Sequence, residues 1–261
     1  MPKLAANLSM LFQEVPFLDR FAAAAACGFK GVEFLFPYEH PPEEIGARLK
    51  QHRLTQALFN LPPGDWAKGE RGMAAIPGRE EEFMATLERA LRYARATDCR
   101  TLHVMAGIWP AGRDKREGGE TYVANLRRAA DRAAKEGITL VIEPLNTRDM
   151  PGYFIATTAE AIAFIDRVGR DNLKLQFDLY HCQIMEGDLA THARRLAGRY
   201  GHVQIAGVPE RHEPDRGEVN YAYLLPLLDE VGYGGWVGCE YRPAGETRAG
   251  LGWAARWGCH P

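Results

Sequence analysis

The chain has 261 residues, of which 46% are hydrophobic and 25% charged, so it has globular composition and can bury a large core. The formal charge of −2 argues against nucleic-acid binding, because a phosphate backbone calls for a basic face. A small anionic substrate, by contrast, needs only one or two local cations. No segment approaches the ~20 apolar residues of a membrane span.

The five cysteines are scattered and odd in number, and no two of them form a CxxC pair. This pattern argues against a disulfide framework, and its spacing excludes a zinc ribbon. The first fifteen residues lack the long apolar stretch of a signal peptide. We therefore expect a cytoplasmic protein with reduced thiols and no membrane partner.

Short apolar segments alternate with longer amphipathic ones along the whole chain. Eight segments are predicted to be strands: 4–9, 31–36, 55–61, 101–107, 139–145, 173–179, 202–207 and 235–241. Between them, residues 80–97 carry one apolar stripe at helical spacing, after three acidic residues in the first turn. Thr157 and Glu160 have the spacing of a capping box and predict another helix start.

Eight strand–helix units predict a parallel sheet that closes into a single-domain (β/α)8 TIM barrel over residues 1–261. An open doubly wound sheet is the alternative, and it calls for a glycine-rich loop after the first strand. Residues 7–17 contain no glycine, so a dinucleotide site there is disfavoured. The irregular segment 61–81 is long enough to be a lid over a site.

Four oxygen-bearing residues fall at the ends of four successive predicted strands, where a barrel of this kind carries its active site. They are Glu143, Asp178, Gln204 and Glu240, spaced 26 to 36 residues apart, about one strand–helix unit each. Carboxylates that converge without a cation would repel one another. Their hard oxygen donors therefore suggest a divalent metal ion, Mg²⁺ or Mn²⁺.

Taken singly, each of these residues has an ordinary structural explanation. A glutamate that closes a strand is most often solvated, Asp178 could form a turn, and Gln204 could bond a neighbouring loop. The joint pattern on four successive strands favours a site. Among the histidines, His181 is best placed for substrate contact, whereas His103 is as well explained by barrel packing and His212 by a solvated loop.

Four long segments resemble hydroxypyruvate isomerase, of the xylose-isomerase-like barrels, and the resemblance covers essentially the whole chain. They are VIEPLNTRDMPGY, LQFDLYHCQIMEGDL, HVQIAGVPERHEPDRGEVNY and GWVGCEYRP. The resemblance implies a metal-assisted aldose–ketose isomerase whose metal is held by Glu143, Asp178, Gln204 and Glu240. The related epimerases usually have HVH where this chain has HVQ. This departure disfavours the epimerase substrates and favours an all-oxygen site.

The expected reaction converts hydroxypyruvate into tartronate semialdehyde through an enediolate, which a divalent ion stabilises. Glu143 and Glu240 are the expected acid and base, doubling as ligands, although their order is not readable. The substrate carboxylate needs a cation. Arg148, Arg71 and Arg211 are the candidates, each of which could instead be a surface arginine, and His181 could share in binding.

Several alternatives use the same barrel. An isomerase of 2-oxo-tetronate is the nearest, an inosose dehydratase would eliminate water, and a barrel that only binds a sugar acid would need no acid–base pair. A DNA-repair nuclease would require several zinc ions, many histidines and a basic track, which eight histidines and a charge of −2 disfavour. We expect a small anionic hydroxy or oxo acid as the partner, and the sequence leaves a homo-oligomer open.

Overall fold

The computed structural model describes residues 2–261 and shows a closed barrel of parallel strands, paired in the order β1 to β8. The strands are β1 (Lys3–Asn7), β2 (Gly31–Phe34), β3 (Thr55–Asn60), β4 (Thr101–His103), β5 (Thr139–Ile142), β6 (Leu173–Asp178), β7 (Tyr200–Ile205) and β8 (Trp236–Cys239). This confirms the predicted (β/α)8 barrel.

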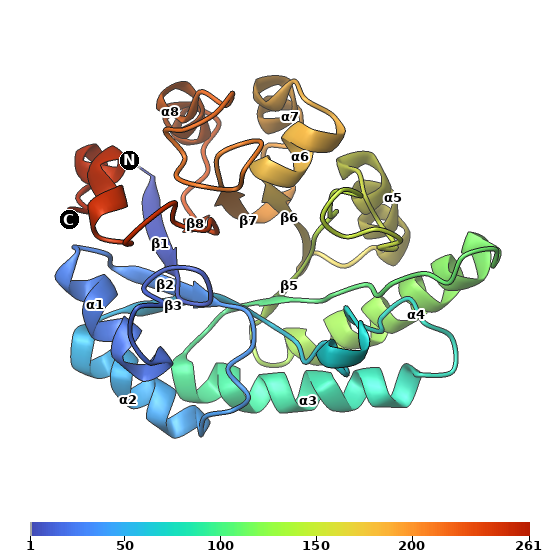
Figure 1. Ribbon diagram of the computed structural model, residues 1–261. Coiled ribbons are helices and arrows are strands. Elements are labelled where there is room, and N and C mark those ends of the chain that lie inside the picture. The colour runs from blue at the N-terminus through green and yellow to red at the C-terminus, as the bar shows by residue number, and fades with distance from the viewer. Residues whose placement is uncertain (1) are drawn as a thin grey trace.

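The helices surround the barrel, with α1 to α4 along one half and α5 to α8 along the other (Figure 1). They are α1 (Arg20–Ala26), α2 (Pro42–His52), α3 (Glu80–Thr97), α4 (Lys115–Ala134), α5 (Thr158–Val168), α6 (Leu179–Met185), α7 (Leu189–Arg195) and α8 (Tyr221–Glu230). Short 3-10 helices span Phe17–Asp19, Trp66–Lys68 and Ala249–Trp257.

The strands are buried on both faces, which explains their nearly continuous apolar sequence. The barrel closes where β8 pairs with β1, with Lys3 opposite Trp236 and Ala6 opposite Cys239. All five cysteines are free and buried, in agreement with the expected reduced thiols. Among residues 2–261, no helix is both long and apolar enough to cross a membrane.

Two helix predictions are confirmed in detail. Helix α3 spans Glu80–Thr97, the predicted range, and buries the side of Phe83, Leu87 and Leu91. Helix α5 begins with the predicted capping box: the Thr157 side chain accepts from the Glu160 N–H, and Glu160 accepts from the Thr157 N–H.

Most predicted strands end one or two residues early, and two of them end three or four residues earlier than expected. The segment 101–107 is a strand only to His103, and 139–145 only to Ile142. Beyond β4 the chain makes an isolated antiparallel bridge between Ala106 and Gly72, which leaves the parallel ladder. Beyond β5, Pro144 has no N–H to donate. Both changes occur at the end of the barrel where functional side chains were expected.

Candidate active site

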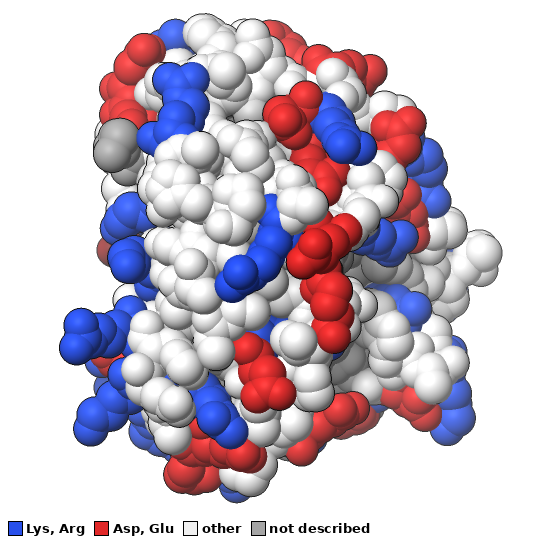
Figure 2. Space-filling view, turned by 60° about the vertical axis from the view of Figure 1, so that its left-hand side comes forward, with Lys and Arg blue, Asp and Glu red and all other residues white. Residues whose placement is uncertain are grey.

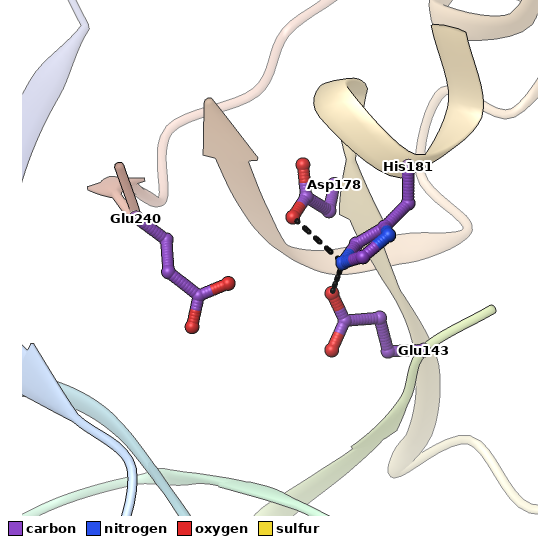
Figure 3. Close-up of side chains that lie close together, drawn as sticks. All are labelled: Glu143, Asp178, His181 and Glu240. Carbon is purple, nitrogen blue, oxygen red and sulfur yellow. Dashed lines mark ion pairs between the residues drawn. The ribbon is translucent and has the colours of Figure 1, made fainter. Parts of the chain in front are cut away.

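Four buried side chains meet at the carboxyl ends of β5, β6 and β8. Glu143 follows β5, Asp178 ends β6, His181 lies in the first turn of α6, and Glu240 follows β8. One ligand atom from each lies within 4.8 Å of the others. Figure 3 shows Glu240 pointing from the far strand toward the space that Glu143 and Asp178 face. The predicted convergence of the three carboxylates is thus present in the structure.

The three carboxylates resist ionisation because they are buried together. Burial, with the charges of Glu240 and Asp178, raises the pKa of Glu143 well above its ordinary value. Burial raises the pKa of Glu240 to about 8 and that of Asp178 to about 6, against the opposing effect of Arg211. Ionising all three would concentrate negative charge in a site of low polarity, which calls for a cation.

Two oxygen atoms in the cluster have no partner that would offset their burial. Glu143 Oε1 and Asp178 Oδ2 are buried and accept no hydrogen bond from any residue that the structure describes. Buried oxygen atoms without a partner destabilise the folded protein unless a ligand or an ion binds to them. The cluster therefore fits a divalent cation, and its carboxylate oxygens suit a hard one.

His181 presents a donor to this cluster. The Asn146 backbone N–H donates to His181 Nδ1 at 3.1 Å, so in the neutral ring the proton is on Nε2. Burial and the charge of Arg211 lower the pKa of His181 well below its ordinary value, which keeps the ring neutral. The Nε2 atom lies 3.6 Å from Asp178 Oδ2 and 3.9 Å from Glu143 Oε1 (Figure 3). This tautomer suits donation to an oxygen better than metal ligation.

Gln204 is the expected ligand whose amide is held elsewhere in this structure. Its Nε2 donates to Glu33 Oε1 at 2.8 Å, and its Oε1 accepts from Gln176 Nε2 at 2.6 Å. The same Gln176 nitrogen donates to Glu143 Oε2 at 2.9 Å. Gln204 is therefore linked to Glu143 only indirectly, through the Gln176 amide. Its role as a metal ligand stays a prediction.

Sequence reasoning missed the buried polar network beneath the cluster. Glu33, fully buried on β2, also accepts from Asn7 Nδ2 at 2.9 Å and pairs with His202 Nε2 at 2.6 Å. A β-carbon on Gly238 would lie 2.2 Å from Glu33 Oε2, so this glycine makes room for the carboxylate. A charged residue inside the apolar run GVEFLF was the available signal.

Of the three arginines predicted to hold the substrate carboxylate, only Arg211 reaches the cluster. It donates to Glu240 Oε2 at 2.6 Å and lies 3.8 Å from Asp178 Oδ2. Arg148 bonds instead to Tyr180 Oη and the Pro209 carbonyl.

The third arginine, Arg71, makes its contacts within its own segment, 61–81. It stacks on the Trp66 ring at 3.5 Å and donates to the Trp66 carbonyl. Neither Arg148 nor Arg71 is among the residues that line the cavity at the cluster.

That cavity has a volume of about 180 Å³. Glu143, Glu240, His181 and Arg211 line it, and Trp66, from the long segment 61–81, borders it as well. Its size is below the roughly 300–1,000 Å³ of pockets for drug-sized ligands, so a ligand must be small. The segment predicted to be a lid thus contributes a wall of the cavity.

Comparison with known proteins places this geometry in a family. Residues 21–257 match the sequence model of the xylose isomerase-like TIM barrel family. A 2-oxo-tetronate isomerase of Cupriavidus necator is 59% identical over 253 residues, covering 97% of both chains. A hydroxypyruvate isomerase of Escherichia coli is 50% identical over 253 residues, covering 97% of this chain and 98% of that relative.

A solved structure from Brucella melitensis, described as an AP endonuclease of family 2, has the same fold with a TM-score of 0.97. It is 58% identical, and the match covers 98% of this chain and 99% of that one. The resemblance found in the sequence is confirmed, and the chain belongs to the xylose isomerase-like TIM barrel family.

Proposed function

We propose that this protein is an isomerase of a short 2-oxo acid, which moves a proton between the second and third carbon atoms. The observation that carries the proposal is the group of three buried carboxylates at one small cavity, with two of them, Glu143 and Glu240, on opposite sides of it. The names of the relatives agree with this reaction class.

For hydroxypyruvate the protons and electrons of the reaction balance as follows. One glutamate removes a proton from C3, and the electron pair moves toward the C2 carbonyl to form an enediolate. A proton is then delivered to C2, the C3 hydroxyl loses its proton to become a carbonyl, and the C2 oxygen gains one. The product is tartronate semialdehyde. Because it is an isomer of the substrate with the same net charge, no redox partner is required.

The residues that would hold a divalent ion, Mg²⁺ or Mn²⁺, are Glu143, Asp178 and Glu240, with Gln204 as the fourth. When bound, the ion supplies positive charge that stabilises the enediolate oxygens. The carboxyl groups of Glu143 and Glu240 hold and move the protons. His181 Nε2–H, beside both Asp178 and Glu143, donates to a substrate oxygen and orients it.

The two glutamates have different surroundings, which suits two different roles. Glu240 pairs with the Arg211 guanidinium, whereas Glu143 accepts one amide hydrogen bond from Gln176. Arg211 is also the cation nearest to the cluster, so it attracts the carboxylate of the substrate.

A second candidate substrate is 2-oxo-tetronate, a four-carbon acid that undergoes the same proton transfer. It is favoured by the higher identity to the 2-oxo-tetronate isomerase, 59%, than to the hydroxypyruvate isomerase, 50%. The cluster serves either acid, because the reacting carbons are the same.

The test is a proton-NMR assay of the purified protein with both acids, before and after chelation and after addition of Mg²⁺ or Mn²⁺. We expect turnover that chelation abolishes and the metal restores. No turnover of either acid in the metal-loaded protein would overturn the proposed activity.

A nuclease is the rival function that the Brucella structure's description raises. Among the described residues, the one group able to hold an ion combines a single histidine with three carboxylates, unlike a histidine-rich zinc centre. On the face in Figure 2, acidic and basic side chains are interspersed, without a continuous basic track. We therefore favour the small acid as the substrate.

A further inference from the structure

Two buried polar side chains in the cavity, His103 and Asn60, make no hydrogen bond to any residue of the described chain. Both ring nitrogens of His103 and the side-chain oxygen of Asn60 are buried without a partner. His103 is 1% exposed and Asn60 3% exposed. Neither side chain is needed by the acid–base chemistry described above, so their burial requires another explanation.

The two residues form one wall of the cavity. Asn60 ends β3 and His103 ends β4, and they are direct partners in the register between these strands. Both line the cavity that holds Glu143 and Glu240, and His103 Nε2 lies 3.7 Å from Glu143 Oε2. A ligand in this cavity therefore meets both groups together.

The chemistry of the pair matches a hydroxyl group. A neutral imidazole offers one donor and one acceptor, and the Asn60 oxygen offers an acceptor. A hydroxyl can donate to Asn60 while it accepts from His103. A carboxylate cannot satisfy the asparagine oxygen, and an apolar group would leave all of these atoms unpaired.

The cations lie on the opposite wall. In a closed barrel of eight strands, β3 and β4 stand across from β7 and β8. Arg211 follows β7 and Arg242 follows β8, and both line the cavity. Within residues 2–261 the Arg242 side chain has no hydrogen-bond or ion-pair partner, while its backbone is held by Arg211 and His212.

We infer that Asn60 and His103 bind the terminal hydroxyl of a four-carbon 2-oxo acid, whose carboxylate faces Arg211 and Arg242. The inference rests on the proposed function and names its substrate. In hydroxypyruvate the only hydroxyl is on the reacting C3, which leaves the pair unused. In the four-carbon acid C4 carries an additional hydroxyl that does not react and can reach this wall.

The kinetic test compares kcat/KM for 2-oxo-tetronate and hydroxypyruvate in the metal-loaded wild type and in His103→Phe and Asn60→Leu. These changes remove no hydrogen bond within the described chain, so folding should be retained. We expect wild type to prefer the four-carbon acid, and each variant to lose that preference by about tenfold or more. Tyr122→Phe is the matched control, because its buried hydroxyl is also unpartnered but lies in α4, outside the cavity.

A binding test separates this inference from the proposed activity. Thermal shifts are measured with erythronate and with glycerate, which carry four and three carbons but do not undergo the reaction. Tighter binding of erythronate that His103→Phe abolishes supports the inference, even if neither oxo acid is turned over. Equal binding of the two acids, or equal loss of kcat/KM for both substrates in the variants, would overturn it.

Discussion

At the scale of single residues, the two cavity glutamates give the sharpest prediction. Glu143→Gln and Glu240→Gln keep the shape of the side chain but remove its capacity to exchange a proton. We expect each to lower kcat by about 10²–10⁴-fold. Both variants should remain folded. Without metal, Glu143→Gln should have a Tm at or above that of wild type, because it removes a buried group that resists ionisation.

The measurement is the NMR turnover assay together with a thermal melt. Glu213→Gln is the control, since Glu213 is also buried but bonds to the Ala244 N–H rather than lining the cavity. Near-normal kcat in Glu143→Gln or Glu240→Gln with metal bound would rule out the acid–base role of that residue.

The site residues that could be predicted were those that follow a recognisable apolar strand in the sequence. Glu143, Asp178 and Glu240 each follow an apolar run, so their meeting at one rim could be deduced from barrel topology. The role of Glu33 could not be predicted. Its buried carboxylate is stabilised by hydrogen bonds with Asn7, Gln204 and His202, and these partners come from strands that are distant in the sequence.

At the scale of elements, the capping box of α5 allows a stability prediction. Thr157→Ala removes the side-chain acceptor of the Glu160 N–H and should cost about 1 kcal/mol. For a chain of this size that corresponds to a Tm decrease of roughly 2–4 °C. Thr86→Ala is the control, because Thr86 bonds only the Phe83 carbonyl inside α3. An unchanged Tm in Thr157→Ala alongside the control would contradict a stabilising cap.

The segment that carries Trp66 allows a second prediction at this scale. The ring borders the cavity, packs 5.2 Å from the Phe36 ring and supports the Arg71 guanidinium. Trp66→Ala should raise KM by about three- to tenfold with a smaller change in kcat, because it opens one wall.

Arg71→Ala should act in the same direction through the position of the Trp66 ring. The increase in KM in the double variant should then be smaller than the product of the fold increases in the two single variants. Independent, additive effects would show that Arg71 does not act through Trp66.

Element ranges were predictable where periodicity and capping agreed, as in α3 and α5. The end of β4 was not, because residues 104–106 beyond it are apolar and continue the strand pattern. What ends β4 is the bridge from Ala106 to Gly72, a contact with a distant loop that no local pattern contains.

At the scale of the whole molecule, the buried carboxylates link stability to pH. Each has a folded-state pKa above that of the unfolded chain, so its contribution is fully present below pH ~4 and is lost as pH rises through its folded pKa. These pKa values are about 6 for Asp178 and about 8 for Glu240. In the presence of a chelator, the Tm of the wild-type protein should therefore fall over pH 5–9 relative to the Tm of the Glu240→Gln variant.

Thermal melts in chelator across this range test the prediction. Added Mg²⁺ or Mn²⁺ should restore more stability at pH 8 than at pH 6, because protons compete with the metal for the same oxygens. A wild-type curve parallel to that of Glu240→Gln would show that Glu240 does not titrate in this window.

The architecture as a whole was the most predictable level, since eight repeats of strand and helix with no glycine-rich first loop leave few alternatives. Which side chains share the cavity was less predictable. Arg148 and Arg71 have the same charge as Arg211, and only the loop that places Arg211 beside Glu240 distinguishes it.

The clustered residues Glu143, Asp178, His181 and Glu240 all come from β5 to β8 and the first turn of α6, whereas the unpartnered Asn60 and His103 come from β3 and β4. This division bears on how such a barrel can evolve. If the proposed roles hold, changes in the first half of the chain alter which acid is accepted, while the second half keeps the proposed proton-transfer groups intact. A new substrate could then arise without rebuilding the chemistry, and duplicated copies could diverge by mutating one half only.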